Sequence, residues 1–416
     1  MDLESSFNAG RLLFAPSRRG LARGLALVGG ASLCNRRPCV VARAQDTKGP
    51  MSSTTEQTAQ ERRAGAPDRR AARAGELSLE GAGVWLVIPC YKVRALILRV
   101  IEKTPPWVDG IVCVDDACPD LSGDFIEAEA TDPRVVVVRL KQNQGVGGAT
   151  LAGYAEAARR GAHILVKVDG DDQMDLGYIA HLVAPIILGE ADYTKGNRFT
   201  SVSHLRNMPG VRVLGNAALS FAAKVSTGYW NIFDPTNGFT AMEATVAKRV
   251  MEKRVSRRFF FETDLLYHLS TLRAVVRDVP MPARYGEEVS NLRIGAIAGP
   301  FALKHARNFF QRVLGQYFVR DFNVATVELI FGLLFLAFGV GYAIHWIVIR
   351  ELGQAASPGR VMAAALPVMV GVQFLLQAIN FDVLNAPTRP IHPYLRTLER
   401  MEAEAEEDAG PNPHPA

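Results

Sequence analysis

Short apolar runs alternate with helix-forming stretches over the first half of this chain's main body. The apolar runs cover residues 84–88, 111–114, 135–140 and 164–168. Helical stretches between them cover residues 95–101 and 149–160. Short strands that alternate with helices predict βαβ units and a parallel sheet. Because crossovers between parallel strands are right-handed, the carboxyl ends of all four strands should lie along one edge of the sheet.

The C-terminal third has a different pattern, with two long uncharged segments. Residues 329–349 and 361–381 are each 21 residues long and contain no Asp, Glu, Lys or Arg. A helix of that length spans about 31 Å, which is enough to cross the hydrocarbon core of a bilayer. The pattern predicts two transmembrane helices, and a buried helix hairpin of a soluble protein is the alternative.

Basic residues are more frequent outside these two segments than between them. Only two Arg lie in the connection, whereas seven basic residues flank the pair: Lys304, Arg307, Arg312, Arg320, Arg389, Arg396 and Arg400. Positive charge near membrane segments marks the cytoplasmic side. The large domain and both termini are therefore expected in the cytoplasm.

Residues 301–322 connect the sheet-forming part to the first uncharged segment. Apolar side chains such as Ala306, Phe309 and Leu314 recur there at helical spacing, and basic residues fill the other faces. This pattern is typical of a helix that lies in the lipid interface, and an amphipathic helix packed on the domain is the alternative. The acidic, proline-containing stretch 402–416 is expected to be a loose tail.

Composition narrows the possible partners and location. Residues 1–80 carry thirteen Lys and Arg against eight Asp and Glu, whereas the rest of the chain is balanced, so we expect no nucleic-acid partner. The composition of residues 1–80 predicts disorder, with a targeting peptide or a misassigned reading frame before Met51 as alternatives. None of the five cysteines forms a C-x-x-C pair, which excludes the common zinc spacings and suits a reducing location.

The acidic stretch Asp169-Gly170-Asp171-Asp172-Gln173 directly follows the fourth apolar run. It should share its sheet edge with Pro89-Cys90-Tyr91 and Asp115-Asp116, where ligands of open α/β folds bind. Carboxylates this close repel one another unless a cation keeps them ionised. Oxygen ligands favour Mg²⁺ or Mn²⁺, and Mg²⁺ is held by one or two carboxylates plus substrate phosphates. The stretch therefore predicts a metal–diphosphate site, with a solvated turn as the alternative.

Three glycines, Gly145, Gly147 and Gly148, open the helical stretch after the third run. Glycine permits close backbone approach, and a helix N-terminus attracts phosphate. The alternative is a dinucleotide-binding G-x-G-x-x-G motif. That motif fails because Thr150 stands at its last glycine position.

Seven motifs follow one another between residues 84 and 382. They are Val87-Ile88-Pro89-Cys90-Tyr91, Val114-Asp115-Asp116, residues 143–149, the acidic stretch from Asp169, Lys195-Gly196-Asn197-Arg198-Phe199, Asp234-Pro235-Thr236-Asn237-Gly238-Phe239 and Arg284-Tyr285-Gly286-Glu287-Glu288-Val289-Ser290. In this order they resemble the family 2 inverting glycosyltransferases of GT-A fold. The nearest branch is that of the polyprenyl-phosphate sugar synthases, which includes dolichyl-phosphate mannose synthases and bactoprenol glucosyltransferases. Two membrane segments after the catalytic domain favour the bactoprenol type.

The resemblance implies an α/β fold with a defined order of domains. A Rossmann-like, mostly parallel sheet with helices on both faces should precede the interfacial helix and the two transmembrane helices. The expected divisions are a disordered or misassigned tail (1–80), a catalytic domain (81–300), the interfacial helix (301–322), the membrane region (323–385) and a cytoplasmic C-terminal tail (386–416).

The resemblance also implies three groups of residues on the donor side. The pocket for the nucleotide base consists of Pro89, Tyr91 and Asp116, with Asp116 bonded to the base. The set that holds Mg²⁺ or Mn²⁺ consists of Asp169, Asp171 and Gln173, whereas Asp172 is expected to be an outward-pointing, solvated charge. The phosphate contacts consist of Gly145, Gly147, Arg198 and Arg212.

On the acceptor side, the resemblance points to the loop that contains Asp234, Gly238 and Phe239. The lipid phosphate would contact Arg284, Ser290 and Arg293. An acidic catalytic group should lie in Phe261-Glu262-Thr263-Asp264, where Glu262 and Asp264 point in different directions on a helix, so one of them is expected to be structural. The implied catalytic residues are Asp171, Arg198, Glu262 and Asp264.

The implied reaction is the inverting transfer of one hexose from UDP-glucose or GDP-mannose to polyprenyl phosphate at the cytoplasmic membrane face. The acceptor is already anionic and hardly needs a general base, so charge neutralisation and alignment would carry catalysis. A processive polysaccharide synthase is the alternative, although the chain lacks a Q-x-x-R-W motif. A non-catalytic lipid-phosphate-binding protein is another. Donor base and sugar, polyprenol and oligomeric state, including a homo-oligomer, stay open.

Overall fold

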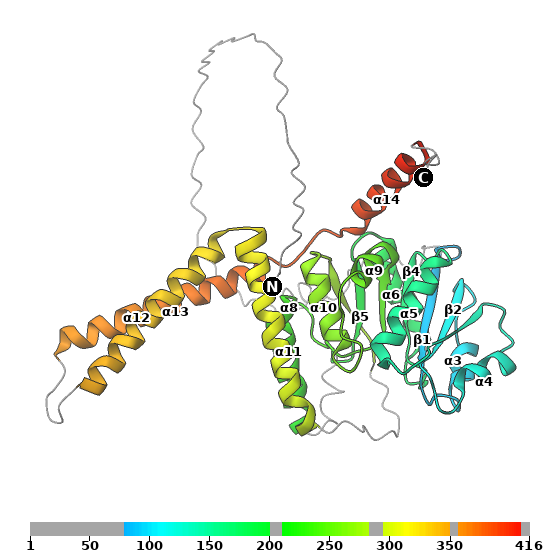
Figure 1. Cartoon of the computed structure of the whole chain (residues 1–416), viewed down its shortest axis with the longest axis horizontal. Helices are drawn as coiled ribbons and strands as arrows, with labels where there is room; N and C mark the ends of the chain where they lie inside the picture. Colours follow the sequence, from blue (N-terminus) through cyan, green and yellow to red (C-terminus); the bar gives the residue numbers. More distant parts are fainter. Residues whose placement is uncertain (1–78, 200–209, 283–293, 350–356, 409–416) are drawn as a thin grey trace, which may run out of the picture. The chain divides into compact units, whose positions relative to one another are not determined.

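The computed structural model of the chain describes residues 79–199, 210–282, 294–349 and 357–408 (Figure 1). All of them belong to one unit, Pro67–Ala416. Of residues 1–80, the structure describes only the last two, so the prediction made for this segment lies almost wholly outside the described residues. Arg284, Ser290 and Arg293 also lie outside them.

A seven-stranded mixed sheet forms the centre of the domain, in the order β3-β2-β1-β4-β6-β5-β7. Its strands are β1 (Val84–Cys90), β2 (Gly110–Asp115), β3 (Val135–Arg139), β4 (Ile164–Lys167), β5 (Tyr193–Asn197), β6 (Thr240–Glu243) and β7 (Val276–Pro280). The first four run parallel to one another, β7 runs parallel to β5, and β6 runs antiparallel to both of its neighbours. The four predicted strands are confirmed, and so is the mostly parallel sheet.

Helices cover both faces of the sheet, as predicted. The helices of the domain are α3 (Ile97–Glu102), α4 (Ser122–Glu129), α5 (Gly145–Arg159), α6 (Ile179–Ile187), α8 (Gly210–Thr227), α9 (Ala244–Met251) and α10 (Phe261–Thr271). Alternate residues of β1 point to opposite faces, so Leu86 and Ile88 join one apolar core with α3, α4 and α6, whereas Val87 joins the other with α5, α9 and α10. This double covering buries the strands and leaves their ends as the place where polar side chains gather.

Two long apolar helices, α12 (Val324–Ile349) and α13 (Pro358–Leu384), pack side by side (Figure 1). Their backbones approach closely, because a Cβ on Gly371 would lie 2.9 Å from Gly332 O. Both are long and apolar enough to cross a membrane, and within the described structure only 22% and 11% of their most apolar windows are buried. Such exposure does not fit the buried helix hairpin of a soluble protein.

The predicted interfacial segment 301–322 belongs to a longer helix, α11 (Ile294–Leu314), followed by a π-helical turn, η2 (Gly315–Arg320). The polar side chains of His305, Asn308 and Arg312 are buried against the domain, whereas Leu303 and Phe310 are exposed. The helix therefore packs on the domain, as the alternative expected, and its position in a lipid interface stays a prediction.

The expectation of a loose tail from residue 402 is wrong for residues 402–408, which belong to helix α14 (His392–Asp408). The helix contacts the domain through ion pairs of Arg396 with Glu243 and of Glu399 with Lys248. The Glu- and Ala-rich sequence that follows consists of good helix formers and extends the docked turns.

Candidate active site

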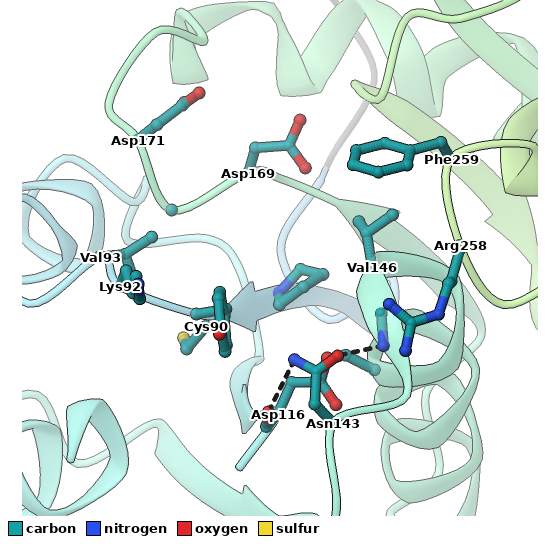
Figure 2. A pocket seen from close by; sticks show the side chains of 15 residues that line it. Cys90, Lys92, Val93, Asp116, Asn143, Val146, Asp169, Asp171, Arg258 and Phe259 are labelled. Carbon is teal, nitrogen blue, oxygen red and sulfur yellow. Dashed lines mark hydrogen bonds between the residues drawn. The ribbon is translucent and has the colours of Figure 1, made fainter. Parts of the chain in front are cut away.

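The ends of β1, β2 and β4 surround a pocket of about 600 Å³, here called the first pocket. The predicted residues that line it are Pro89, Tyr91, Asp116, Gly145, Asp169 and Asp171. Figure 2 shows Asp169 and Asp171 on one side of this pocket and Asp116 with Asn143 on the other. The predicted convergence of polar strand ends at one sheet edge is therefore confirmed.

Asp116 joins the end of β2 to the glycine-rich turn before α5. Its buried carboxylate accepts hydrogen bonds from the backbone N–H groups of Gln144 (2.6 Å) and Gly145 (2.8 Å). The Asn143 side chain donates to the Asp116 carbonyl at 3.2 Å. Asp116 thus shapes the wall of the first pocket, and its contact with a nucleotide base stays a prediction.

The glycines of this turn are required by close packing. Gly145 has a φ of +81°, and a Cβ there would lie 2.8 Å from Arg257 O. The N–H groups of Gly147 and Gly148 both donate to Arg257 O, at 2.9 and 3.1 Å. These two donors of the helix N-terminus are therefore engaged within the protein, whereas Gly145 lines the first pocket. The phosphate contact of Gly147 stays a prediction.

A second, smaller pocket of about 130 Å³ adjoins the acidic stretch. Asp169, Asp171 and Gln173, the predicted metal set, all line it, as does Arg198. Asp171 Oδ1 accepts a hydrogen bond from the Gln173 backbone N–H at 3.1 Å, which holds the turn together.

Asp172 differs from its prediction as an outward-pointing, solvated charge. It has a φ of +57°, and its carboxylate lies 2.6 Å from Lys103 Nζ with 14% of its side chain exposed. The left-handed turn rotates this side chain away from its neighbours and against α3, where Lys103 caps the helix end. Asp172 is therefore a paired, mostly buried group outside the two described pockets.

Lys167, a buried lysine that the sequence analysis did not single out, pairs with the first aspartate of the acidic stretch. Lys167 is 1% exposed, and its Nζ lies 2.6 Å from Asp169 Oδ1 and 3.6 Å from Glu262 Oε1. Burial alone would lower the pKa of Lys167, but the carboxylates of Asp169 and Glu262 hold that pKa above its ordinary value. The available signal was a single lysine inside an otherwise apolar strand, two residues before the first aspartate.

The structure separates the two acids of α10. Glu262 faces Lys167, and burial raises the pKa of its carboxyl group. Asp264 points instead toward α11, where it accepts hydrogen bonds from Ser256 N (2.7 Å) and Asn308 Nδ2 (2.9 Å). Neither acid lines the first or the second pocket.

The loop formed by residues 234–239 supplies Thr236, Asn237, Gly238 and Phe239 to the lining of the second pocket. Buried Asp234 forms a two-point ion pair with Arg198, with Nε–Oδ2 at 2.8 Å and Nη2–Oδ1 at 3.1 Å. Buried Lys195 donates to the Asp234 carbonyl, and Lys167 donates to the Gly238 carbonyl at 3.4 Å. A Cβ on Gly238 would lie 2.7 Å from Asp169 Oδ2, so only glycine lets the loop approach the acid this closely.

Other predicted residues are less fully placed. Arg212 lies in α8, and its side chain is outside the described part. Arg258 and Phe259, which the sequence did not single out, line the first pocket beside Val146 (Figure 2). They precede α10, and their sequence carries no signal for this position.

The carboxylates of the acidic stretch are suitable ligands for a divalent cation. The described residues contain no cluster of three or more His, Cys, Asp and Glu able to enclose a metal. Asp169 and Asp171 instead offer carboxylate oxygens to a shared space, and Lys167 engages Asp169 Oδ1 while Oδ2 lies beside Gly238. Two carboxylates with the remaining ligands supplied by a phosphate-bearing substrate is the arrangement that Mg²⁺ commonly adopts.

A mostly parallel sheet with an acidic turn at its carboxyl edge defines a GT-A-like fold. In agreement, residues 85–251 match the model of glycosyl transferase family 2. The chain therefore carries a glycosyltransferase domain of this family and is a glycosyltransferase.

Curated relatives include several lipid-linked sugar transferases. The chain is 28% identical over 218 residues to the UDP-N-acetylglucosamine–dolichyl-phosphate N-acetylglucosaminyltransferase of Methanococcus voltae, which covers 49% of this chain and 86% of the relative. It is 28% identical over 221 residues to the undecaprenyl-phosphate mannosyltransferase of Micrococcus luteus (52% and 89%). It is 29% identical over 202 residues to the polyprenol monophosphomannose synthase of Mycolicibacterium smegmatis (47% and 75%).

Among solved structures, glucosyl-3-phosphoglycerate synthase from Mycobacterium tuberculosis is similar to this chain with a TM-score of 0.43 and 19% identity. The match covers 57% of this chain and 83% of that one.

Proposed function

We propose that this enzyme transfers a single hexose from a nucleotide-sugar donor to a polyprenyl phosphate at the cytoplasmic face of a membrane. The observation that carries the proposal is the meeting of three strand ends, with Tyr91, Asp116 and the pair Asp169–Asp171, around one pocket. Two exposed apolar helices on the same chain and relatives named for transfer to dolichyl, undecaprenyl or polyprenol phosphate support a lipid acceptor.

The donor would occupy both pockets. The first pocket has the room and the aromatic lining for a nucleoside, with Tyr91 and Phe259 available for stacking and Asp116 for a hydrogen bond. Asp169 and Asp171 line both pockets, so the diphosphate would lie where the pockets meet. The sugar would then extend into the second pocket, toward Arg198 and the 234–239 loop.

Asp169, Asp171 and Gln173 would hold Mg²⁺ or Mn²⁺ beside the diphosphate. When bound, a divalent cation there would neutralise the charge that develops on the leaving nucleoside diphosphate. Lys167 fixes the orientation of Asp169 from below, and Glu262 holds Lys167 in turn. Arg198, anchored by Asp234, would place a positive charge beside the second pocket, close to the phosphate groups of the donor.

The acceptor side follows from the nature of a lipid phosphate. A polyprenyl phosphate is an anion at neutral pH, so it can attack the sugar without a general base. The enzyme then needs to bring two anions together, which oriented cations and restricted geometry accomplish. The residues 234–239, here called the acceptor-side loop, line the second pocket together with the acidic stretch. Attack by the acceptor phosphate on the face of the sugar opposite the leaving diphosphate would invert the anomeric centre.

The direct test is transfer of label to lipid. Purified full-length chain in vesicles with undecaprenyl phosphate would be incubated separately with radiolabelled UDP-glucose, GDP-mannose and UDP-N-acetylglucosamine. We expect one donor to label a chloroform-soluble product in the presence of Mg²⁺ or Mn²⁺. Asp169→Ala and Asp171→Ala should abolish labelling while the protein remains in the membrane.

A matched control is Asp172→Ala, next to the acidic pair but bonded to Lys103 outside both pockets. It should retain transfer. Full activity of Asp169→Ala and Asp171→Ala would refute the assigned site, and absence of labelled lipid with every donor would refute the proposed acceptor.

A further inference from the structure

Asp382, in the last turn of α13, joins the second membrane helix to three other parts of the chain. Its carboxylate forms a two-point ion pair with Arg312 of α11, with Nη1–Oδ1 at 2.6 Å and Nη2–Oδ2 at 3.0 Å. The indole N–H of Trp230 donates to Oδ2 at 2.8 Å, and the Tyr317 hydroxyl donates to Oδ1. One side chain thus collects four hydrogen bonds from α11, η2 and the segment after α8.

The hydrogen-bonded cluster of Asp382, Arg312, Trp230 and Tyr317, here called the Asp382 joint, contains a buried ion pair. The Arg312 side chain is 2% exposed and that of Asp382 is 11% exposed. Arg312 also donates to Val225 O at 2.9 Å, and a Cβ on Gly228 would lie 2.7 Å from Arg312 Nη1. Gly228 has a φ of +78°, so the turn that ends α8 leaves space that the guanidinium fills. A desolvated two-point pair of this kind fixes direction as well as distance.

Trp230 connects the Asp382 joint to the loop that lines the second pocket. Four residues after it stands Asp234, the first residue of the acceptor-side loop and the partner of Arg198. The connection is held along its length, because Lys224 Nζ donates to Trp230 O and Ser220 Oγ donates to Phe233 O at 2.7 Å. The segment therefore connects the end of α13 to the edge of the second pocket through a series of hydrogen bonds.

We infer that Asp382 is a positioning residue that sets the acceptor-side loop at a fixed place relative to the end of the second membrane helix. This inference rests on the proposed function, in which the acceptor is a lipid. On this view the two apolar helices do more than anchor the enzyme, since they define where the sugar-accepting edge stands above the bilayer.

The inference separates two kinds of acceptor. The phosphate of a long polyprenyl chain is confined to the membrane surface and reaches the site only if the loop stands at the matching height. A short-chain, water-soluble isoprenyl phosphate can enter from solution at any orientation. Loosening the Asp382 joint should therefore harm the first acceptor far more than the second.

The experiment compares wild type with Asp382→Asn and Trp230→Phe, as full-length protein in vesicles. Asp382→Asn weakens the pair with Arg312, whereas Trp230→Phe removes one N–H donor and keeps an aromatic ring beside Phe221. For undecaprenyl phosphate in the bilayer we expect kcat/KM to fall about tenfold or more, equivalent to about 1.4 kcal/mol. For citronellyl phosphate in solution, and for the KM of the donor, we expect changes within about twofold, less than 0.5 kcal/mol.

Asp124→Asn is the matched control. Asp124 lies on α4 and forms an exposed ion pair with Arg139, so the variant makes the same chemical change at an exposed position. It should leave both acceptors unaffected. Equal losses on the two acceptors in Trp230→Phe would show a merely structural role, and no loss in either variant would overturn the inference directly. Failure of the wild type to use either acceptor would instead refute the proposed function, and the inference with it.

Discussion

Lys167 Nζ lies 2.6 Å from Asp169 Oδ1, so the first carboxylate of the acidic stretch is held in place by a buried ammonium group. Glu262 lies 3.6 Å from the same nitrogen. The lysine thus balances two carboxylates in a site that is closed to solvent on that side. Its position explains how an acid that stands two residues beyond a buried strand keeps one defined orientation before any ligand arrives.

Replacing Lys167 by an uncharged residue should lower the stability of the folded protein and its activity. Lys167→Met removes the ammonium group that pairs with both Asp169 and Glu262, and breaking a buried pair on one side costs about 3–5 kcal/mol. We expect a clearly lower thermal midpoint in detergent and loss of sugar transfer. Lys103→Met is the control, because Lys103 is 52% exposed and its pair with Asp172 should contribute less than about 1 kcal/mol. Equal stability of the two variants would contradict this account.

The two acids of α10 should behave differently when each is replaced by its amide. Glu262→Gln keeps the shape but removes a charge that holds Lys167, so we expect kcat to fall on the order of tenfold with a small change in thermal midpoint. Asp264→Asn sets an amide N–H₂ against the donors of Ser256 or Asn308, which should cost about 1–3 kcal/mol of stability. Its kcat per folded molecule should stay near that of wild type, and the reverse pattern would refute the assignment.

The acidic stretch and the four parallel strands could be predicted because both depend on local sequence. Each strand consists mainly of an apolar run, which is typical of the buried strands of parallel sheets. Because crossovers between parallel strands are right-handed, Pro89, Asp116 and Asp169 were expected at one sheet edge, and they line one pocket. In these cases local pattern and tertiary structure agree.

The strands at the other end of the sheet could not be predicted in the same way. β5 reads Tyr-Thr-Lys-Gly-Asn and β7 reads Val-Arg-Asp-Val-Pro, without an apolar run. Buried Lys195 is tolerated in β5 because the carbonyl of Asp234 accepts its hydrogen bond, a partner 39 residues away. The same holds for Asp172, which pairs with Lys103, and for the contacts of Lys167 with Glu262 and Gly238, although its nearest partner Asp169 is only two residues away. Pairing between remote side chains is a property of the fold, and no local pattern reveals it.

Metal removal should stop transfer and weaken donor binding. In the proposed complex, the carboxylates of Asp169 and Asp171 would share this space with a diphosphate, and without a cation their charges would repel. We expect EDTA to abolish transfer and Mn²⁺ or Mg²⁺ to restore it. Asp171→Asn should raise the metal concentration needed for half-maximal nucleotide binding by at least about tenfold, a loss of about 1.4 kcal/mol, measured by calorimetry with the nucleoside diphosphate alone. Nucleotide binding of equal strength in EDTA would contradict the metal role.

Acid should destabilise the contact between α11 and the domain through His305. Burial lowers the pKa of this imidazole below 6.5, and its Nδ1 lies 2.8 Å from Ser226 Oγ. Because the folded pKa is below the unfolded one, stability is fully present above pH 6.5 and is lost as the pH falls through the folded pKa, by at most about 1.4 kcal/mol per pH unit. His305→Gln should therefore reduce the drop in thermal midpoint between pH 7 and 5, and half-buried His268, whose pKa is also lowered by burial, should contribute to the drop that remains. Ser226→Ala should lower stability while it leaves the pH dependence in place, and an unchanged slope in His305→Gln would exclude His305 as its source.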